Sequence, residues 1–337
     1  MKPVHILMPA YNVEKYIGKA IQSFLDQDYR NTKLIIIDDG STDKTIETID
    51  GYLKWFPGQI IVKINSHNEG LAVTRKKLWD LSKEIDPNAY IGWLYADDSY
   101  TAPNILSSIM TQMLRTGAEV CLLNFTVAYE DETQRQNAAG LRCDLANHQE
   151  LLKTIDGSVS PLSRDLEKVT TLGWAKFYSP TAKFYEPLPL PYEDFISLAS
   201  VYLASSVTAL RTPAIEFFRR SSSLVGQRTA ENFTVHIPAQ LEHLFGTIYE
   251  QTRGFDEVQR LELLKRVAGS VTNKIDQYMT TLGDIVATRK RTDINQSTLE
   301  HYKDLATKLE DKMSVSLKAL SEEKEERVLA GVPGCRP

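Results

Sequence analysis

The chain has few cysteines, and none of them has the spacing of a metal-binding pair. Its 337 residues include three cysteines, Cys121, Cys143 and Cys335. An odd count without a Cys-x-x-Cys spacing argues against a disulfide framework and against structural zinc. No run approaches the roughly 18 apolar residues of a membrane span, and Met1 leads into a strand pattern rather than an apolar signal core. We therefore expect a cytoplasmic protein with no membrane span.

An excess of positive charge is also missing. The formal net charge is -5 and the pI is near 5.8, which argues against a nucleic-acid partner gripped through the overall field of the protein. Hydrophobic residues make up 42% and charged residues 25%, as in ordinary globular proteins. The length allows one large domain with an appendage, or two domains.

The most informative stretch is Leu34–Asp43, in which a buried strand runs into acids. Four apolar residues, three of them β-branched, predict a strand covered on both faces, as in a parallel sheet. Asp38, Asp39 and Gly40 follow, and then Ser, Thr and Asp residues that can begin a helix. Ligands of open α/β sheets bind beyond the carboxyl ends of strands, so these acids are placed to touch one. The alternative is a plain strand-to-helix turn with a solvated pair of acids.

Strand and helix patterns alternate through the first hundred residues. The spacing of apolar residues predicts strands over 4–8, 34–37, 60–64 and 90–95, and helices over 13–27, 42–56 and 71–82. We expect the first strand to stop at Pro9, because proline cannot donate to a strand ladder. This alternation is typical of a doubly wound, mostly parallel sheet. A second acid pair, Asp97-Asp98, falls at the end of the fourth strand.

Two carboxylate clusters at one edge of a sheet need a chemical reason. Facing carboxylates repel each other unless a cation lies between them. Mg²⁺ and Mn²⁺ take oxygen ligands and keep positions open for phosphate oxygens, so Asp97-Asp98 suit a metal-bridged diphosphate. Asp39 could then accept hydrogen bonds from a base or a sugar, and Tyr11 could stack on a base. Tyr11 as a packing residue at a helix start is the alternative.

These residues carry a resemblance to a known family. Pro9-Ala10-Tyr11-Asn12, Asp38-Asp39-Gly40-Ser41-Thr42-Asp43, Asn68-Glu69-Gly70 with Arg75, and Ala96-Asp97-Asp98 resemble, in order and spacing, the family-2 glycosyltransferases of the GT-A fold. The resemblance extends to about Leu224. It implies a GT-A nucleotide-sugar-binding fold, a donor that is usually a UDP-sugar, a Mn²⁺ or Mg²⁺ cofactor, and sugar transfer with inversion.

Matched residue by residue, the resemblance also implies roles. Tyr11 and Asp39 would hold the base, with Pro9 lining that pocket and Asp38 beside the nucleoside. The acids Asp97 and Asp98 would supply metal and ribose contacts. The remaining donor-side residues are Asn68, Gly70 and Arg75, together with Arg219 and Arg220, of which either could offset charge on the leaving group. A solvated basic turn is the alternative for the two arginines.

The catalytic base is expected in the segment Tyr192-Glu193-Asp194-Phe195. Acids in the first turn of a helix are favoured by its dipole, so a plain helix start is the alternative interpretation. In the family, an Asp in this Glu-Asp context takes the proton from the acceptor hydroxyl, which inverting transfer requires. Asp194 matches that position, with Glu193 as the second candidate. The segment Trp174–Tyr178, which contains Lys176, is similar to a family segment below the acceptor cleft.

One position departs from the family pattern. Many members carry another Asp two residues before Asp97, where this chain has Tyr95. This favours an alternative from a different class, a catalytically weakened GT-A scaffold or nucleotide-binding module, although Asp39, Asp97, Asp98 and Asp194 are all present. A nucleotidyltransferase is a further alternative, but the first loop lacks the Gly-rich, basic sequence usual there.

After Gln227 the pattern becomes helical. Apolar stripes predict helices over 236–251, 255–287 and 298–328, and a charged helix carries Leu309, Met313, Leu317 and Leu320 along one face. We expect three regions, a catalytic domain over 1–226, a helical domain over 227–329 and a disordered tail over 330–337. The stripes predict a homo-oligomer assembled through these helices; the alternative is that they form part of the acceptor cleft. The donor sugar and the acceptor, a surface polysaccharide, a lipid-linked glycan or a glycoprotein glycan, stay open.

Overall fold

The computed structural model describes residues 1–129, 174–189, 193–219, 230–288 and 293–329. Its contacts divide the chain into two compact units, one made of 1–154 with 159–226 and the other of 155–158 with 227–337. We call them the α/β unit and the helical unit, and each is described by itself. The predicted tail over 330–337 lies outside the described residues, and the roles predicted for the two regions stay predictions.

The α/β unit is built on one eight-stranded sheet with the order β3-β2-β1-β4-β7-β6-β8-β5. Its first half pairs in parallel, β1 with β2 and β4, and β2 with β3. Its second half is mixed, because β7 runs antiparallel to both β4 and β6. The strands are β1 (Val4–Ala10), β2 (Thr32–Asp38), β3 (Ile60–Ile64), β4 (Tyr90–Trp93), β5 (Ser99–Tyr100), β6 (Val120–Tyr129), β7 (Lys176–Tyr178) and β8 (Val207–Arg219).

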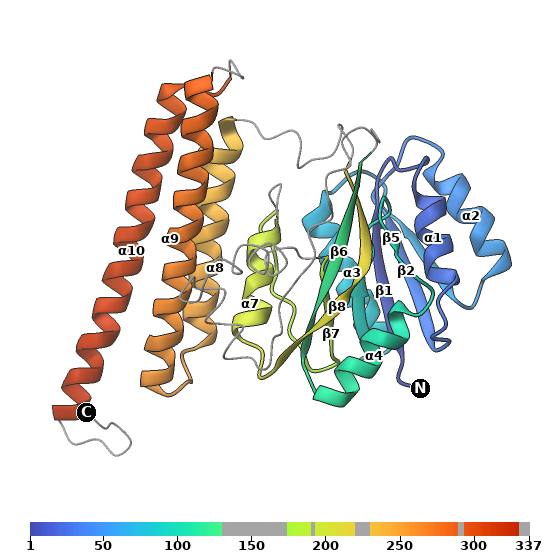
Figure 1. Ribbon diagram of the computed structural model, residues 1–337, viewed down its shortest axis with the longest axis horizontal. Helices are drawn as coiled ribbons and strands as arrows, with labels where there is room; N and C mark the ends of the chain where they lie inside the picture. Colours follow the sequence, from blue (N-terminus) through green and yellow to red (C-terminus); the bar gives the residue numbers. More distant parts are fainter. Residues whose placement is uncertain (130–173, 190–192, 220–229, 289–292, 330–337) are drawn as a thin grey trace. The chain divides into compact units, whose positions relative to one another are not determined.

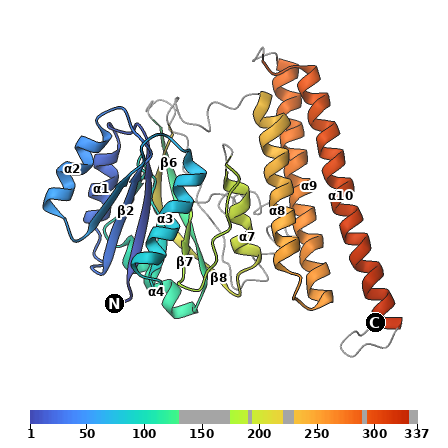
Figure 2. The same ribbon diagram turned by 180° about the vertical axis from the view of Figure 1, so that it is seen from behind.

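Helices cover both faces of the first half. The helices α1 (Ile17–Leu25) and α2 (Thr45–Trp55) lie on one face, and α3 (Leu71–Ile85) lies on the other (Figures 1 and 2). Right-handed crossovers require this, because the chain steps outward from β1 to β2 to β3 and then returns past β1 to β4. The strand order therefore reverses between β1 and β4, where open α/β sheets bind their ligands. The predicted doubly wound, mostly parallel sheet is confirmed.

The core follows the predicted apolar periodicity. All seven residues of β1 are buried, and α1 buries Ile17, Ala20, Ile21 and Phe24, which share one helix face. The helix α4 (Ile105–Thr116) packs on β6 and β8. Cys121 in β6 is fully buried, and burial raises the pKa of its thiol to about 12, so it is a core residue as expected.

Pro9 does not end its strand, contrary to expectation. The strand β1 continues through Pro9 to Ala10, paired with Ile37 and Asp38 of β2. The register between β1 and β4 stops at Leu7 and Trp93. Every second residue of a strand directs its backbone groups to the same side, so the nitrogen of Pro9 points toward β4, as the backbone groups of Leu7 do. No residue of β4 is paired with Pro9. The missing N–H therefore costs no ladder hydrogen bond.

The helical unit is a group of long helices packed side by side (Figure 1). A short π-helical turn (Asn232–His236) leads into α8 (Ile237–Gln251), followed by α9 (Glu257–Thr288) and α10 (Gln296–Leu329). Their apolar stripes face one another and bury, among others, Leu244, Leu264, Val267, Tyr302 and Met313. None of the helices in the described part of the chain combines the length and apolar character needed to cross a membrane.

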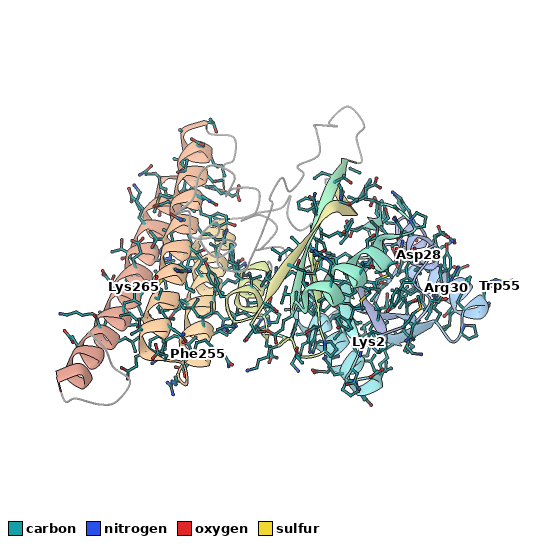
Figure 3. The ribbon with its side chains drawn as sticks, turned by 60° about the horizontal axis from the view of Figure 1, so that its bottom comes forward. Lys2, Asp28, Arg30, Trp55, Phe255 and Lys265 are labelled. Carbon is teal, nitrogen blue, oxygen red and sulfur yellow. The ribbon has the colours of Figure 1, made fainter. Side chains whose placement is uncertain are left out.

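The predicted stripe of α10 is partly satisfied within the chain. Leu309 and Met313 are buried, whereas Leu317 and Leu320 are only half-buried and Val315 is 69% exposed. We predicted that this stripe would be covered by a second copy of the chain. For its first half, Leu309 and Met313, this is wrong, because these residues are already covered within the chain. Other large apolar side chains on the surface are Trp55, 82% exposed at the end of α2, and Phe255 between α8 and α9 (Figure 3).

Candidate functional site

Three loops meet where the first strands end. The register pairs Ala10 of β1 with Asp38 of β2, and Asp38 with Ile64 of β3. The residues that follow each strand therefore lie level with one another at the edge of the sheet formed by the carboxyl ends of its strands. Backbone hydrogen bonds continue the ladder past this point, from Asp39 N to Ala10 O at 2.8 Å and from Asn65 N to Asp38 O at 2.8 Å. These two bonds join the loops that follow β1, β2 and β3.

Asp39 accepts three hydrogen bonds at this edge, all from N–H groups. Its Oδ1 accepts hydrogen bonds from Asn65 Nδ2 at 2.7 Å and from the Glu69 amide at 3.0 Å. Its Oδ2 accepts one from the Gly70 amide at 2.9 Å. Asp39 is only 4% exposed, so these three N–H donors replace the water that would otherwise bind its oxygens. A buried carboxylate held in this way presents a fixed acceptor to a ligand.

Asp38 has a different task, because it holds the turn that follows β2. Its two oxygens accept hydrogen bonds from the Ser41 amide at 2.8 Å and the Ser41 hydroxyl at 2.5 Å. The same hydroxyl accepts from the Asn12 amide at 2.9 Å, and Asn12 Oδ1 accepts from the Thr42 amide at 2.9 Å. Asn12 has a φ of 50°, a conformation that Asn tolerates better than most residues. The β1 and β2 loops are therefore tied together, and Asp38, fully buried, lies beneath them.

Two glycines permit these loops to approach each other. Gly40 has a φ of 73°, and a Cβ there would lie 2.7 Å from the carbonyl carbon of His67. Gly70 has a φ of 90°, although a Cβ there would meet nothing within 4 Å. The first glycine is required by space and backbone conformation, and the second by backbone conformation alone.

Tyr11 and Asn68 lie on the two loops next to Asp39, since Asp39 N donates to Ala10 O and Asp39 Oδ2 accepts from the Gly70 amide. Tyr11 follows β1 and is 43% exposed, which leaves an aromatic surface for a planar ligand. Asn68 Oδ1 accepts from the Gly70 amide at 2.8 Å, so it shapes the loop that presents this amide to Asp39. Pro9 lies in β1 directly before this edge. The structure thus brings together the residues predicted to bind the base, and their binding role stays a prediction.

The second acid pair lies at the end of β4, across the switch point. Asp98 is 2% exposed, and its Oδ1 accepts a hydrogen bond from the Phe218 amide of β8 at 2.9 Å. The ring of Phe218 lies 5.3 Å from that of Tyr16, and β5, directly after Asp98, pairs with β8. Asp97 is half-buried. The end of β8 therefore adjoins the acid pair, and Arg219 is its last residue.

Some predicted residues cannot be placed at the level of their side chains. The side chain of Arg219 and the whole of Arg220 lie outside the described residues. Glu193 and Asp194 begin a 3₁₀ turn (Glu193–Ile196) that continues into α7 (Ser197–Tyr202), and only their backbone is described. The predicted helix start is present, and the side chain that would act as base stays a prediction.

Arg75 and Lys176 are both buried close to α7. The guanidinium of Arg75 lies 4.5 Å from the centre of the Trp93 ring, and Arg75 is 3% exposed. It lines a small pocket with residues of β7, of the segment 183–187 and of α7. Lys176 is fully buried and donates to Ser197 Oγ at 2.9 Å. Arg75 therefore has a packing role against Trp93 besides its predicted donor role.

Comparison with known proteins decides the family. The model of the family described as glycosyl transferase family 2 matches residues 5–185, more than half of the chain. This chain belongs to glycosyl transferase family 2. The match includes the ends of β1 to β4 and the loops that follow them, and it stops before β8.

Relatives and structures agree with this family. An uncharacterized glycosyltransferase of Haemophilus influenzae is 38% identical over 98 residues, which cover 29% of this chain and 37% of that protein. The putative glycosyltransferase EpsH of Bacillus subtilis is 25% identical over 235 residues, 66% of this chain and 62% of EpsH. The matched regions thus span less than two thirds of these relatives. Residues 1–349 of S. aureus TarS, solved in complex with UDP-GlcNAc, share the fold with a TM-score of 0.59 at 13% identity, over 94% of this chain and 92% of that chain.

Sequence reasoning missed two residues of this family-2 site. Asn65 contacts Asp39 directly, and Lys77 on α3 donates to Asn65 Oδ1 at 3.1 Å and to Glu69 Oε1 at 2.6 Å. The signal for Asn65 was its place directly after a strand whose end is level with Asp39. Lys77 carries no such signal, because only the course of α3 past the β3 loop brings it close.

Proposed function

We propose that this family-2 protein is an inverting glycosyltransferase that moves a sugar from a UDP-sugar to a hydroxyl of a glycan acceptor. The observation that carries the proposal is Asp39, a buried carboxylate fixed by three N–H donors next to the loop that carries the exposed Tyr11. A fixed acceptor next to an aromatic surface suits a nucleobase. The fold shared with TarS, which was solved with UDP-GlcNAc, supports a UDP-sugar donor.

The other predicted residues complete the donor site in this proposal. Tyr11 stacks on the base, with Pro9 at the pocket floor and Asp38 near the nucleoside. Asn68 and Gly70 present the loop on the third side, and Arg75 closes it from α3. Arg219 and Arg220, at and beyond the end of β8, offset charge on the departing diphosphate.

A divalent metal fits the acids present. Among the described residues there is no cluster of three or more His, Cys, Asp or Glu side chains that could hold a metal. These residues therefore do not form a metal site from protein ligands alone. Mg²⁺ and Mn²⁺ are commonly held by one or two carboxylates together with substrate phosphates, and Asp97 with Asp98 supplies those oxygens. The half-buried Asp97 is the more accessible, since Oδ1 of Asp98 accepts from the β8 backbone. When bound, the metal would neutralise charge on the diphosphate.

The chain's own contribution to the transfer step is the base. The acceptor oxygen attacks the anomeric carbon as the bond from that carbon to the diphosphate oxygen breaks, and its electron pair leaves with UDP. The hydroxyl proton passes to the carboxylate of Asp194, with Glu193 as the second candidate. The position of both acids at the start of the turn before α7 supports this assignment.

One assay separates this proposal from a nucleotide-binding module without turnover. The purified chain is incubated with a panel of UDP- and GDP-sugars and Mn²⁺, and nucleotide release is measured with and without EDTA. We expect slow hydrolysis of one UDP-sugar that EDTA abolishes and excess Mn²⁺ restores. Full activity in EDTA would remove the metal from the proposal, and UDP binding without any release would favour the module.

The helical unit is proposed to join copies of the chain. Val315 is exposed and Leu317 and Leu320 are only half-buried, so the far half of α10 retains apolar surface. Light scattering at micromolar concentration should report an oligomer, and a chain ending near Gly226 should scatter as a smaller species that still binds UDP. A full-length monomer would instead favour a role for the helices at the acceptor.

A further inference from the structure

The side-chain amide of Asn65 is held at both of its ends. Its Nδ2 donates to Asp39 Oδ1 at 2.7 Å, and its Oδ1 accepts from Lys77 Nζ at 3.1 Å. An amide can rotate by 180° and exchange its oxygen for its nitrogen with little change in shape. The two partners leave only one arrangement, because an ammonium group can only donate and a carboxylate can only accept. Asp39 and Lys77 therefore favour the same orientation, with the NH₂ group toward Asp39, and Lys77 holds the oxygen end of the amide in place.

Lys77 also contacts the second loop residue that holds Asp39. Its Nζ lies 2.6 Å from Glu69 Oε1, and the backbone amide of Glu69 donates to Asp39 Oδ1 at 3.0 Å. One lysine on α3 thus contacts the two residues whose N–H groups converge on Oδ1. The side chain of Lys77 is 42% exposed and that of Glu69 is 25% exposed, so an ion pair in this position contributes little to stability on its own. Its effect is to orient the groups that donate to Asp39.

We propose that Lys77 is a positioning residue for the nucleotide site: through Asn65 and Glu69 it fixes the carboxylate of Asp39 in the orientation that receives the base. The inference rests on the proposed function, because it assigns to Asp39 the role of binding a nucleotide. Lys77 touches no ligand in this scheme. Its loss lowers nucleotide affinity by letting the Asn65 amide and the β3 loop adopt orientations that bind poorly, while the fold is retained.

The test measures the affinity of the full chain for UDP by calorimetry. Replacing Lys77 with methionine keeps the length of the side chain and removes its donors, and Kd should rise roughly 3- to 10-fold, the worth of one net hydrogen bond. Lys77→Arg retains the donors and should recover most of the affinity. The melting temperature of each variant without nucleotide is recorded, and we expect it to stay close to that of the parent chain.

The neighbouring lysine supplies a matched control. Lys76 lies on the same helix but pairs with Asp80 four residues on and has no contact with the β3 loop among the described hydrogen bonds. Lys76→Met makes the same chemical change one residue away and should leave the Kd for UDP unchanged. An equal loss in both variants would show a nonspecific effect of charge and would overturn the proposal.

A double-mutant cycle tests the route of the effect. If Lys77 acts through Asn65, Lys77→Met should weaken UDP binding less in an Asn65→Ala background than in the parent chain. Fully additive effects would overturn this route. If the parent chain and Lys77→Met bind UDP equally well, the inference about Lys77 is wrong and the proposed function is unaffected. If the parent chain binds no UDP, the proposed function and the inference are both wrong.

Discussion

The two units of this chain use hydrogen bonds in opposite ways. In the α/β unit, buried acids connect distant segments: Asp39 accepts from the Asn65 side chain and the Glu69 amide, and Asp98 accepts from the Phe218 amide. Among the described residues of the helical unit, most charged pairs lie about one turn apart on the same helix, such as Arg266 with Glu262 and Lys308 with Asp304, while Lys312 with Glu242 joins α10 to α8. Apolar stripes hold its helices together.

This difference indicates where chemistry can occur. A local pair on one helix adjusts the stability of that helix but does not fix its position against another. Long-range bonds to buried acids fix atoms from separate loops at once, as a binding site requires. Substitutions in the first unit should therefore change ligand binding and turnover, whereas substitutions in the second should change stability and assembly. Four predictions test this comparison.

The largest effect is expected at the proposed base. Asp194→Asn should reduce turnover by ~10²–10⁴-fold, the usual contribution of a general base, while the Kd for UDP stays nearly constant. Steady-state rates together with calorimetry separate the two quantities. If Asp194→Asn retains its rate and Glu193→Gln loses it, the base is one residue earlier.

A core substitution in the helical unit should show the opposite pattern. Leu264 of α9 is fully buried, so Leu264→Ala leaves a cavity and should cost about 2–5 kcal/mol in the free energy of unfolding of that unit. Denaturant titration should show the loss, and the Kd for UDP should stay as in the parent chain. A matched fall in UDP affinity would show that the units do not divide these tasks.

Gly40 offers a smaller effect in the α/β unit. Gly40→Ala forces a side chain into a left-handed backbone conformation and toward the His67 backbone, which should cost about 1–3 kcal/mol and weaken UDP binding, because the loop carrying Gly70 must shift. Gly58→Ala is the control, since a Cβ there meets nothing within 4 Å. Equal UDP affinity in the two variants would contradict the proposed contact between the loops.

The smallest effect concerns pH. Burial lowers the pKa of His5 in β1 below its ordinary value of 6.5, against the opposing charge of Asp86. The unfolded chain therefore binds the proton more readily, and His5 favours folding above pH 6.5 and loses this contribution as the pH falls through its lowered folded pKa, by at most about 1.4 kcal/mol per pH unit. Urea titrations of the α/β unit at pH 7.5 and 5.5 should show a smaller difference for His5→Asn than for the parent chain. An unchanged difference would assign the acid sensitivity to other groups.

The sequence revealed much of this fold because its strands are locally consistent. The run Leu34–Ile37 is apolar and β-branched, and such a strand is recognisable without tertiary information. The strand β8 was not predicted: its sequence contains Pro213, and its register against β6 shifts where Asn124 pairs with that proline. A bulge breaks the alternation of side chains, so no period-two pattern indicates this strand.

The residues of the site also differ in how far the sequence predicts their positions. Asp39 and Asp98 could be predicted because acids directly after apolar strands share an edge of the sheet. The contacts of Asn65 and Lys77 depend on the register of β2 against β3 and on the course of α3, which no local pattern specifies. The strand β8 enters the site through the Phe218 amide, a backbone group that carries no residue signature.

That last contact also sets an order of events during synthesis. The donor on Phe218 lies 120 residues after the acceptor on Asp98. At about 5–20 residues per second, a ribosome needs roughly 6–24 s to make this stretch. During that interval β1 to β4 can pair with one another. Asp98, in the loop after β4, still lacks its donor on β8, and the side of β6 that pairs with β8 is still exposed. A nascent chain stalled before Val207 should therefore bind holding chaperones that a chain extended past Arg219 has already released.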